Sequence, residues 1–135
     1  MARILPLLLL MWTAITGCRD GAAPIDGALY RVEVSGESFH VLLRDSATIA
    51  DVESRLAADV WEGIVNGEIA HGDGGFNEPW SWHMIPETIA LADFTIELCD
   101  GRPSLVEADL AYWVDTVGRF CPWGGRIVER VNEPQ

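Results

Sequence analysis

Residues 30–44 read YRVEVSGESFHVLLR, and they set the architecture of the chain. Apolar residues alternate with polar ones in two runs, Tyr30, Val32 and Val34, then Phe39, Val41 and Leu43. A period of two places the apolar side chains on one face of a strand. The polar stretch 35–38 separates the runs, so we predict a β-hairpin with one buried face. His40 falls on the opposite face and is expected to point at solvent.

The period changes after the hairpin and predicts a first helix over residues 48–56. Ile49, Val52 and Leu56 fall on one face of this helix. Thr48 and Asp51 have the spacing of a capping box at its start.

The middle of the chain predicts a turn and extended segments. Asn66-Gly67 is typical of a turn, and residues 68–71 are expected to form a short strand. Residues 82–85 and 89–99 also read as extended. Within the longer stretch, polar residues alternate with three apolar ones, Phe94, Ile96 and Leu98.

A second helix is predicted to open at Pro103-Ser104, with Ser104 and Glu107 as its capping box. Its apolar face comprises Val106, Leu110, Trp113, Val114 and Val117. Gly118 is the expected C-terminal stop, and residues 126–131 form a last strand. The pattern favours an α+β fold with a mainly antiparallel sheet of about five or six strands and two helices.

The N-terminus predicts export from the cell. Residues 1–17 read as a signal peptide, because Arg3 precedes an apolar run over 4–12 that is too short to span a bilayer. The stretch ITGC at 15–18 resembles the lipobox of bacterial lipoproteins. We therefore expect Cys18 to be lipidated and to anchor the protein to a membrane. The alternative is an ordinary signal peptide followed by a chance cysteine.

The cleavage site divides the rest of the chain into two parts. Residues 18–27 are small and polar and are expected to form a lipidated flexible tether. Residues 28–135 are expected to form a single globular domain. Arg19 stands at the position where an Asp would resemble the mark of lipoproteins retained in the inner membrane. We therefore expect a location in the bacterial cell envelope, at the outer membrane if the host has one.

The chain is strongly acidic, with 21 Asp and Glu against nine Lys and Arg and a net charge of −12. A nucleic-acid partner is excluded, because binding phosphate requires a basic face. The acidity fits a well-solvated secreted surface, or a patch that binds cations or a basic partner.

Cys99 and Cys121 remain once Cys18 is assigned to the lipid. Outside the cytoplasm, two remaining cysteines predict a disulfide. Free thiols or a metal site are the alternatives, although the pair lacks a Cys-x-x-Cys motif.

The densest functional candidate is a tryptophan cluster. Trp80, Trp82 and His83 lie together, and Trp123 lies in a second Pro-Trp motif. Exposed indole rings stack on planar faces and donate a hydrogen bond. We therefore name these four residues as candidate ligand-binding residues. The alternative is that the tryptophans fill the core of a small domain.

Two sets of residues are possible metal ligands, His71, Asp73 and His83 for zinc, and Asp100, Glu107 and Asp109 for calcium. Neither spacing matches a familiar site.

Ser81 lies near His83, but there is no Gly-x-Ser-x-Gly elbow. Glu97 and Asp100 form a carboxylate pair of a kind that is common in an acidic chain. We predict no metal, no cofactor and no catalytic residue.

Several motifs together resemble a small secreted domain family, the N-terminal domain of binding protein 74, a slime-mould glycoprotein. The motifs are PWSWH at 79–83, ELCDG at 97–101, Pro103-Ser104, Val106-Glu107 and CPW at 121–123. The resemblance covers roughly residues 30–131. It implies an extracellular module without assigned catalytic residues, whose paired cysteines fall on Cys99 and Cys121.

The leading hypothesis is a membrane-anchored extracytoplasmic lipoprotein with a small binding domain for a protein or glycan ligand. One alternative is an inhibitor or immunity-type protein that blocks an envelope enzyme. A third is a small hydrolase that uses His83.

Overall fold

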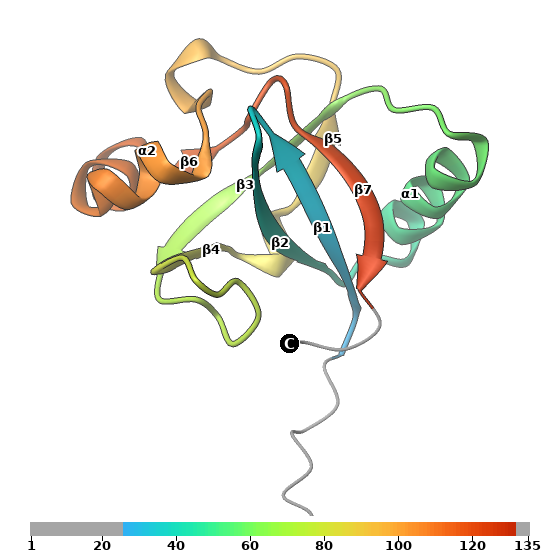
Figure 1. The fold of residues 1–135 in the computed structure, drawn as a ribbon, viewed down its shortest axis with the longest axis horizontal. Helices are drawn as coiled ribbons and strands as arrows, with labels where there is room; N and C mark the ends of the chain where they lie inside the picture. Colours follow the sequence, from blue (N-terminus) through green and yellow to red (C-terminus); the bar gives the residue numbers. More distant parts are fainter. Residues whose placement is uncertain (1–25, 132–135) are drawn as a thin grey trace, which may run out of the picture.

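The computed structural model describes residues 26–131 (Figure 1). The predicted signal peptide and Cys18 lie outside these residues. The elements in chain order are β1 (Ala28–Val34), β2 (Glu37–Leu43), α1 (Ser46–Ala58), β3 (Ile64–His71), β4 (Trp82–Met84), η1 (Pro86–Thr88), β5 (Ala90–Ala92), η2 (Glu97–Cys99), α2 (Pro103–Ala108), η3 (Tyr112–Val117), β6 (Arg119–Phe120) and β7 (Arg126–Val131). All strand pairs in this part of the chain are antiparallel, which confirms the predicted α+β class. Over the described residues, no helix is long and apolar enough to span a bilayer.

The predicted hairpin is confirmed and forms a three-stranded sheet in the order β2-β1-β7. Val34 pairs with Glu37, so the turn consists of Ser35 and Gly36. Both turn residues have positive φ, at 52° and 80°, as tight hairpins prefer. The inner face of β1 and β2 is fully buried, with Tyr30, Val32, Phe39 and Val41 at most 1 % exposed.

His40 departs from its predicted position in solvent. It is half-buried on the outer face of this sheet, and its Nδ1 atom is buried without a hydrogen-bond partner among the described residues. Burial lowers the pKa of His40 below its usual value. The prediction was wrong because the loop after β3 covers this part of the outer face.

β3 is the centre of the second sheet. Its N-terminal half pairs with β5, its C-terminal half with β4, and Gly67-Glu68 pair with β6. The turn predicted at Asn66-Gly67 is therefore wrong, because both residues lie inside β3. A Cβ atom at Gly67 would lie 3.2 Å from the Ile89 side chain. Glycine serves here to allow close packing and not to form a turn.

The extended segment predicted over 89–99 forms a strand only at Ala90–Ala92. Ala92 pairs with Ile64, the first residue of β3. The chain then runs past the start of its partner strand, and residues 93–96 belong to no sheet. Phe94, Ile96 and Leu98, which the sequence pattern placed in a half-buried strand, are consequently exposed.

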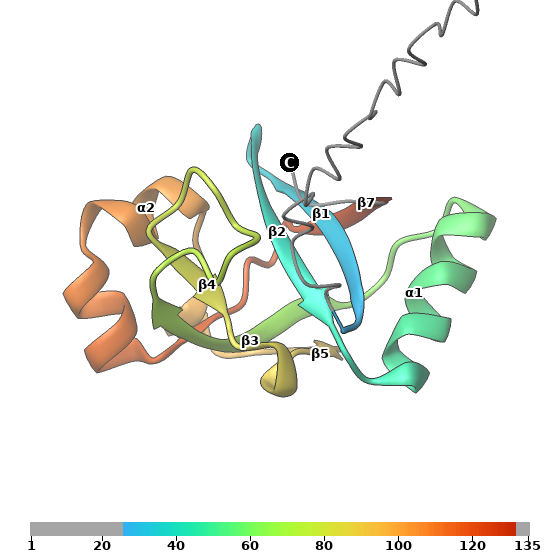
Figure 2. The ribbon, with the colours of Figure 1, turned by 90° about the horizontal axis from the view of Figure 1, so that it is seen from below.

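The core is an aromatic cluster between the two sheets. The Trp82 ring centroid lies 5.6 Å from that of Phe39 and 5.2 Å from that of Phe120. Trp113 packs edge-on against Phe120 at 5.9 Å. Figure 2 shows α1 on one side of the strands and α2 on the other.

The first helix is confirmed, but its cap is not the predicted one. The α1 helix begins at Ser46, and the Asp45 carboxylate accepts hydrogen bonds from the Thr48 backbone N–H and hydroxyl, both at 2.7 Å. Because the helix starts earlier than predicted, Asp51 lies inside it and instead pairs with Arg55 at 2.9 Å.

The second helix begins at Pro103 as predicted but breaks at Asp109, where φ is −144°. A π-helical segment, η3, continues to the predicted stop at Gly118. The capping box predicted for Ser104 is wrong, because Glu37 of β2 accepts the hydrogen bonds from the Ser104 N–H and hydroxyl at 2.8 and 2.7 Å. These bonds lower the pKa of Glu37 below its usual value. A tertiary partner therefore caps this helix.

Asn77 is a buried polar residue that joins the loop after β3 to both sheets. Its Oδ1 accepts a hydrogen bond from the His40 N–H of β2 at 2.7 Å. Its Nδ2 donates to the Trp82 carbonyl of β4 at 2.7 Å. The side chain is fully buried, so no water can replace either bond.

We expect Asn77→Ala to lower the free energy of unfolding by about 2–3 kcal/mol, because two buried backbone groups lose their partners. Urea unfolding followed by circular dichroism measures this loss. Asn66→Ala is the matched control, since Asn66 is half-buried and makes one side-chain hydrogen bond, to Arg119. Equal losses in the two variants would contradict the assigned role of Asn77.

Candidate functional site

The structure does not bring the four predicted ligand-binding residues into one exposed platform. Trp82 is fully buried in the core. Trp80 is half-buried, and its Nε1 donates to the Ser38 carbonyl on β2 at 2.8 Å. Trp123 is 46 % exposed and lies beside the disulfide. Of these three tryptophans, only Trp123 presents a large surface to a ligand.

His83 on β4 is half-buried and faces the glycine-rich loop. Its Nδ1 donates to the Gly72 carbonyl at 2.7 Å, and its ring packs edge-on against Phe76 at 5.7 Å. The Ser81 N–H donates to Glu107. Among residues 26–131, no hydrogen bond joins the Ser81 hydroxyl to His83, so this pair does not form a nucleophile and base.

The possible metal ligands are dispersed. His71 contacts Asp115 at 3.3 Å and His83 contacts Gly72. The three acids considered for calcium bind backbone N–H groups in different places. The Asp100 carboxylate accepts the Trp123 N–H, Glu107 accepts the Ser81 N–H, and Asp109 accepts the Tyr112 N–H. Within the described part of the chain, no three His, Cys, Asp or Glu residues converge.

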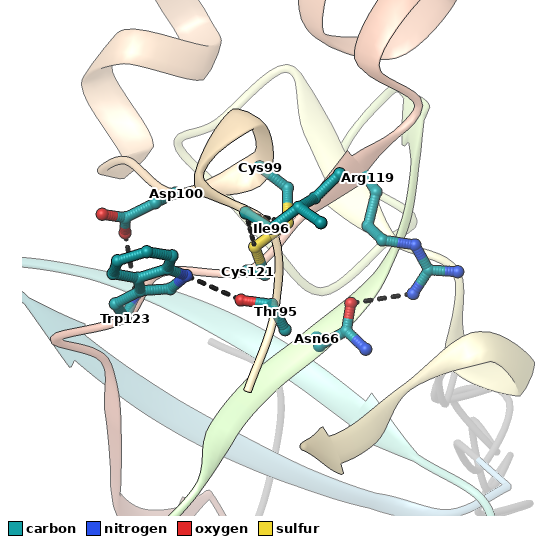
Figure 3. Close-up of a disulfide and its surroundings, with 8 residues drawn as sticks. All are labelled: Asn66, Thr95, Ile96, Cys99, Asp100, Arg119, Cys121 and Trp123. Carbon is teal, nitrogen blue, oxygen red and sulfur yellow. Dashed lines mark hydrogen bonds between the residues drawn. A yellow bond between two sulfur atoms is a disulfide. The ribbon is translucent and has the colours of Figure 1, made fainter. Parts of the chain in front are cut away.

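The disulfide predicted between Cys99 and Cys121 is confirmed (Figure 3). The two Cα atoms are 5.1 Å apart, and the Cys121 N–H donates to the Cys99 carbonyl at 2.8 Å. Both cysteines are buried. The bond fastens η2 to the residues that follow β6, far from it in the sequence.

Trp123 is fixed by two hydrogen bonds next to this disulfide (Figure 3). Its backbone N–H donates to the Asp100 carboxylate at 2.8 Å, and its indole Nε1 donates to the Thr95 hydroxyl at 2.6 Å. The bond to Thr95 places the indole ring against the segment that leaves β5. This segment is therefore held at Thr95 and again at Cys99.

The held segment presents apolar side chains to solvent. Phe94 is 85 %, Ile96 65 % and Leu98 57 % exposed. We call these three residues together with Trp123 the apolar rim. Asp93 directly precedes Phe94, and Glu97 lies between Ile96 and Leu98, so both place negative charge beside the rim residues. The sequence pattern placed three of the four in a strand, because their alternation does not reveal that β3 begins too late to pair with them.

These features define a small, disulfide-bonded α+β domain with an exposed apolar rim and no cluster of catalytic groups among residues 26–131. The chain belongs to the family of the binding protein 74 N-terminal domain, whose model matches residues 27–134. This match confirms the resemblance drawn from the sequence motifs. No curated protein and no solved structure matches the chain.

Proposed function

We propose that this protein is a membrane-anchored extracytoplasmic lipoprotein whose domain binds another protein through the apolar rim. The leader over residues 1–17 and the lipobox ending at Cys18 support the location. The disulfide also fits, because such bonds persist in oxidising compartments such as the bacterial periplasm and cell surface.

We infer the binding function from the exposure of the apolar rim. Phe94 has 85 % of its surface in water, so packing against residues 26–131 does not explain its presence. Large exposed apolar residues gathered on a small domain mark interaction sites, and the hydrogen bond from Trp123 to Thr95 brings Trp123 to the segment that holds the other three. Because Thr95 and Cys99 already hold the segment, a partner that binds it loses little conformational entropy.

A protein partner fits the rim better than a glycan or a nucleic acid. Three of its side chains are aliphatic or a phenyl ring, which suit an apolar pocket of a protein partner. A sugar-stacking platform would need several exposed aromatic faces, and Trp82 is buried. Asp93 and Glu97, next to the rim residues in the sequence, repel phosphate.

The position of the rim also supports this function. β1 starts at Ala28, next to the predicted tether, whereas Val34 at its other end lies beside Asp100 and Gly124. Seven residues of strand separate these ends by about 20 Å. In Figure 1 the segment from 93 to 100 lies at the top and β1 starts at the bottom. A lipid at Cys18 would therefore leave the rim facing away from the bilayer.

The proposal is tested by placing a photo-crosslinking amino acid at Phe94 in the full chain in its native host. We expect one defined protein adduct in the membrane fraction. The double substitution Ile96→Ser/Leu98→Ser is expected to reduce its yield about tenfold, because truncated contact residues weaken binding by more than about 1 kcal/mol. The Cys18→Ser variant should move the adduct to the soluble fraction.

The matched control places the same crosslinker at Val60, which is apolar and 51 % exposed but outside the rim. An adduct of equal yield from Val60 would contradict binding through the rim. Retention of Cys18→Ser in the membrane fraction would contradict the lipid anchor. A stoichiometric adduct with an envelope hydrolase would identify the protein as an inhibitor, the alternative that the sequence left open.

A further inference from the structure

A second surface lies near the start of β1. A cleft of about 640 Å³ opens between the outer face of the three-stranded sheet and the glycine-rich loop that follows β3. This volume lies in the range of small-molecule sites. The loop lies near the start of β1 in Figure 1, at the other end of the strand from the apolar rim. The protein-binding proposal therefore makes no use of the cleft.

The floor of the cleft is half charged and half apolar. Arg31 of β1 stands between His40 of β2 and Glu129 of β7 in the register of the sheet. One step along the same face, Leu29 stands beside Val131. Both rows line the cleft. Leu29 is buried and Val131 is half-buried, so a bound molecule meets polar groups at one end and a narrow strip of aliphatic surface at the other.

The wall of the cleft is a loop with a defined shape. The Asp73 carboxylate accepts the Gly75 N–H at 2.9 Å, and its carbonyl accepts the N–H groups of Phe76 and Asn77. Gly74 has a φ of 66°, and a Cβ atom there would lie 2.8 Å from the rings of both Phe76 and His83. Only glycine fits, so the loop packs against β4 and holds Phe76 at the cleft.

The electrostatics of the cleft favour a cation. The Arg31 guanidinium is already paired with Glu33 and with Glu129. Glu78 and Asp73 also line the cleft, and neither makes an ion pair within residues 26–131. Among residues 26–131, more carboxylates than guanidinium groups therefore line the cleft, and Arg31 is neutralised by two neighbouring acids.

We propose that this cleft binds a small organic cation, an aliphatic molecule that carries a primary ammonium group. The ammonium group contacts the carboxylates of Asp73 and Glu78. The aliphatic body lies on Leu29, Phe76 and Val131. Neither contact alone would be selective in so acidic a protein, but the two together recognise an amphipathic amine.

The test measures binding of three probes with the same six-carbon body, hexylammonium, hexanol and hexanoate, by chemical-shift changes in the full-length protein. We expect hexylammonium to bind at least about fivefold more tightly than hexanol, because it adds a charge contact to the same apolar contact. Hexanoate is expected not to saturate. The shifted amides should include those of Gly75 and Phe76.

Two substitutions separate a site from general acidity. Glu78→Gln is expected to weaken hexylammonium binding about threefold or more, with hexanol binding unchanged. Glu62→Gln removes the same charge outside the cleft and is expected to have no effect. Equal affinity for the three probes, or equal weakening by the two substitutions, would overturn the proposal.

Discussion

Replacing Trp82 by alanine is expected to lower the free energy of unfolding by about 3–5 kcal/mol. The indole is fully buried and contacts the rings of Phe39 and Phe120, which come from the two sheets. Its removal opens a cavity at the centre of the domain. Because a domain is stable by only about 5–15 kcal/mol, the variant should unfold at much lower urea concentration, as circular dichroism would show.

Two further variants separate this packing role from a surface role. Trp82→Phe keeps an aromatic ring, so we expect it to lower the free energy of unfolding by clearly less, about 1–2 kcal/mol. It also removes an indole N–H that is buried without a partner among the described residues. Trp123→Ala, at the half-exposed rim position, should cost about 1 kcal/mol or less. Similar losses for Trp82→Ala and Trp123→Ala would contradict the division between core and rim.

Removing the disulfide is the second large effect that we expect. The double substitution Cys99→Ala/Cys121→Ala should lower the free energy of unfolding by about 3 kcal/mol, since the bond closes a loop of roughly 23 residues in the unfolded chain. The loss is measured by urea unfolding. The loop includes the whole second helical region, so its freedom in the unfolded state is large.

Reduction provides the control for this variant. Dithiothreitol should shift the unfolding midpoint of the parent protein toward that of the double variant and leave the variant unchanged. An unchanged midpoint in the reduced parent would show that the bond does not stabilise the fold. If the double variant loses more free energy of unfolding than the reduced parent does, the difference measures the packing contributed by the two buried sulfur atoms.

The sequence predicts the disulfide at the candidate site but not most of the residues of the apolar rim. Cys99 and Cys121 are paired as the sequence predicts, because a predicted compartment and a count of cysteines leave few alternatives. Of the four residues predicted to bind a ligand, only Trp123 lies on the apolar rim. The other rim residues escaped prediction because alternation indicates a strand whether or not a partner strand is present.

The sequence by itself determined the hairpin, the first helix, the stop at Gly118 and the final strand. The hairpin, the first helix and the stop at Gly118 depend on contacts between residues near one another in the chain, and periodicity or backbone preference reports such contacts directly. The final strand pairs with the distant β1, and the sequence indicated only its extended conformation. The tertiary structure alone decided that Trp82 is buried, that Glu37 caps the second helix, and that Phe94 faces water. Those outcomes depend on which distant segment packs beside each residue and on where that segment ends. A local sequence pattern indicates neither.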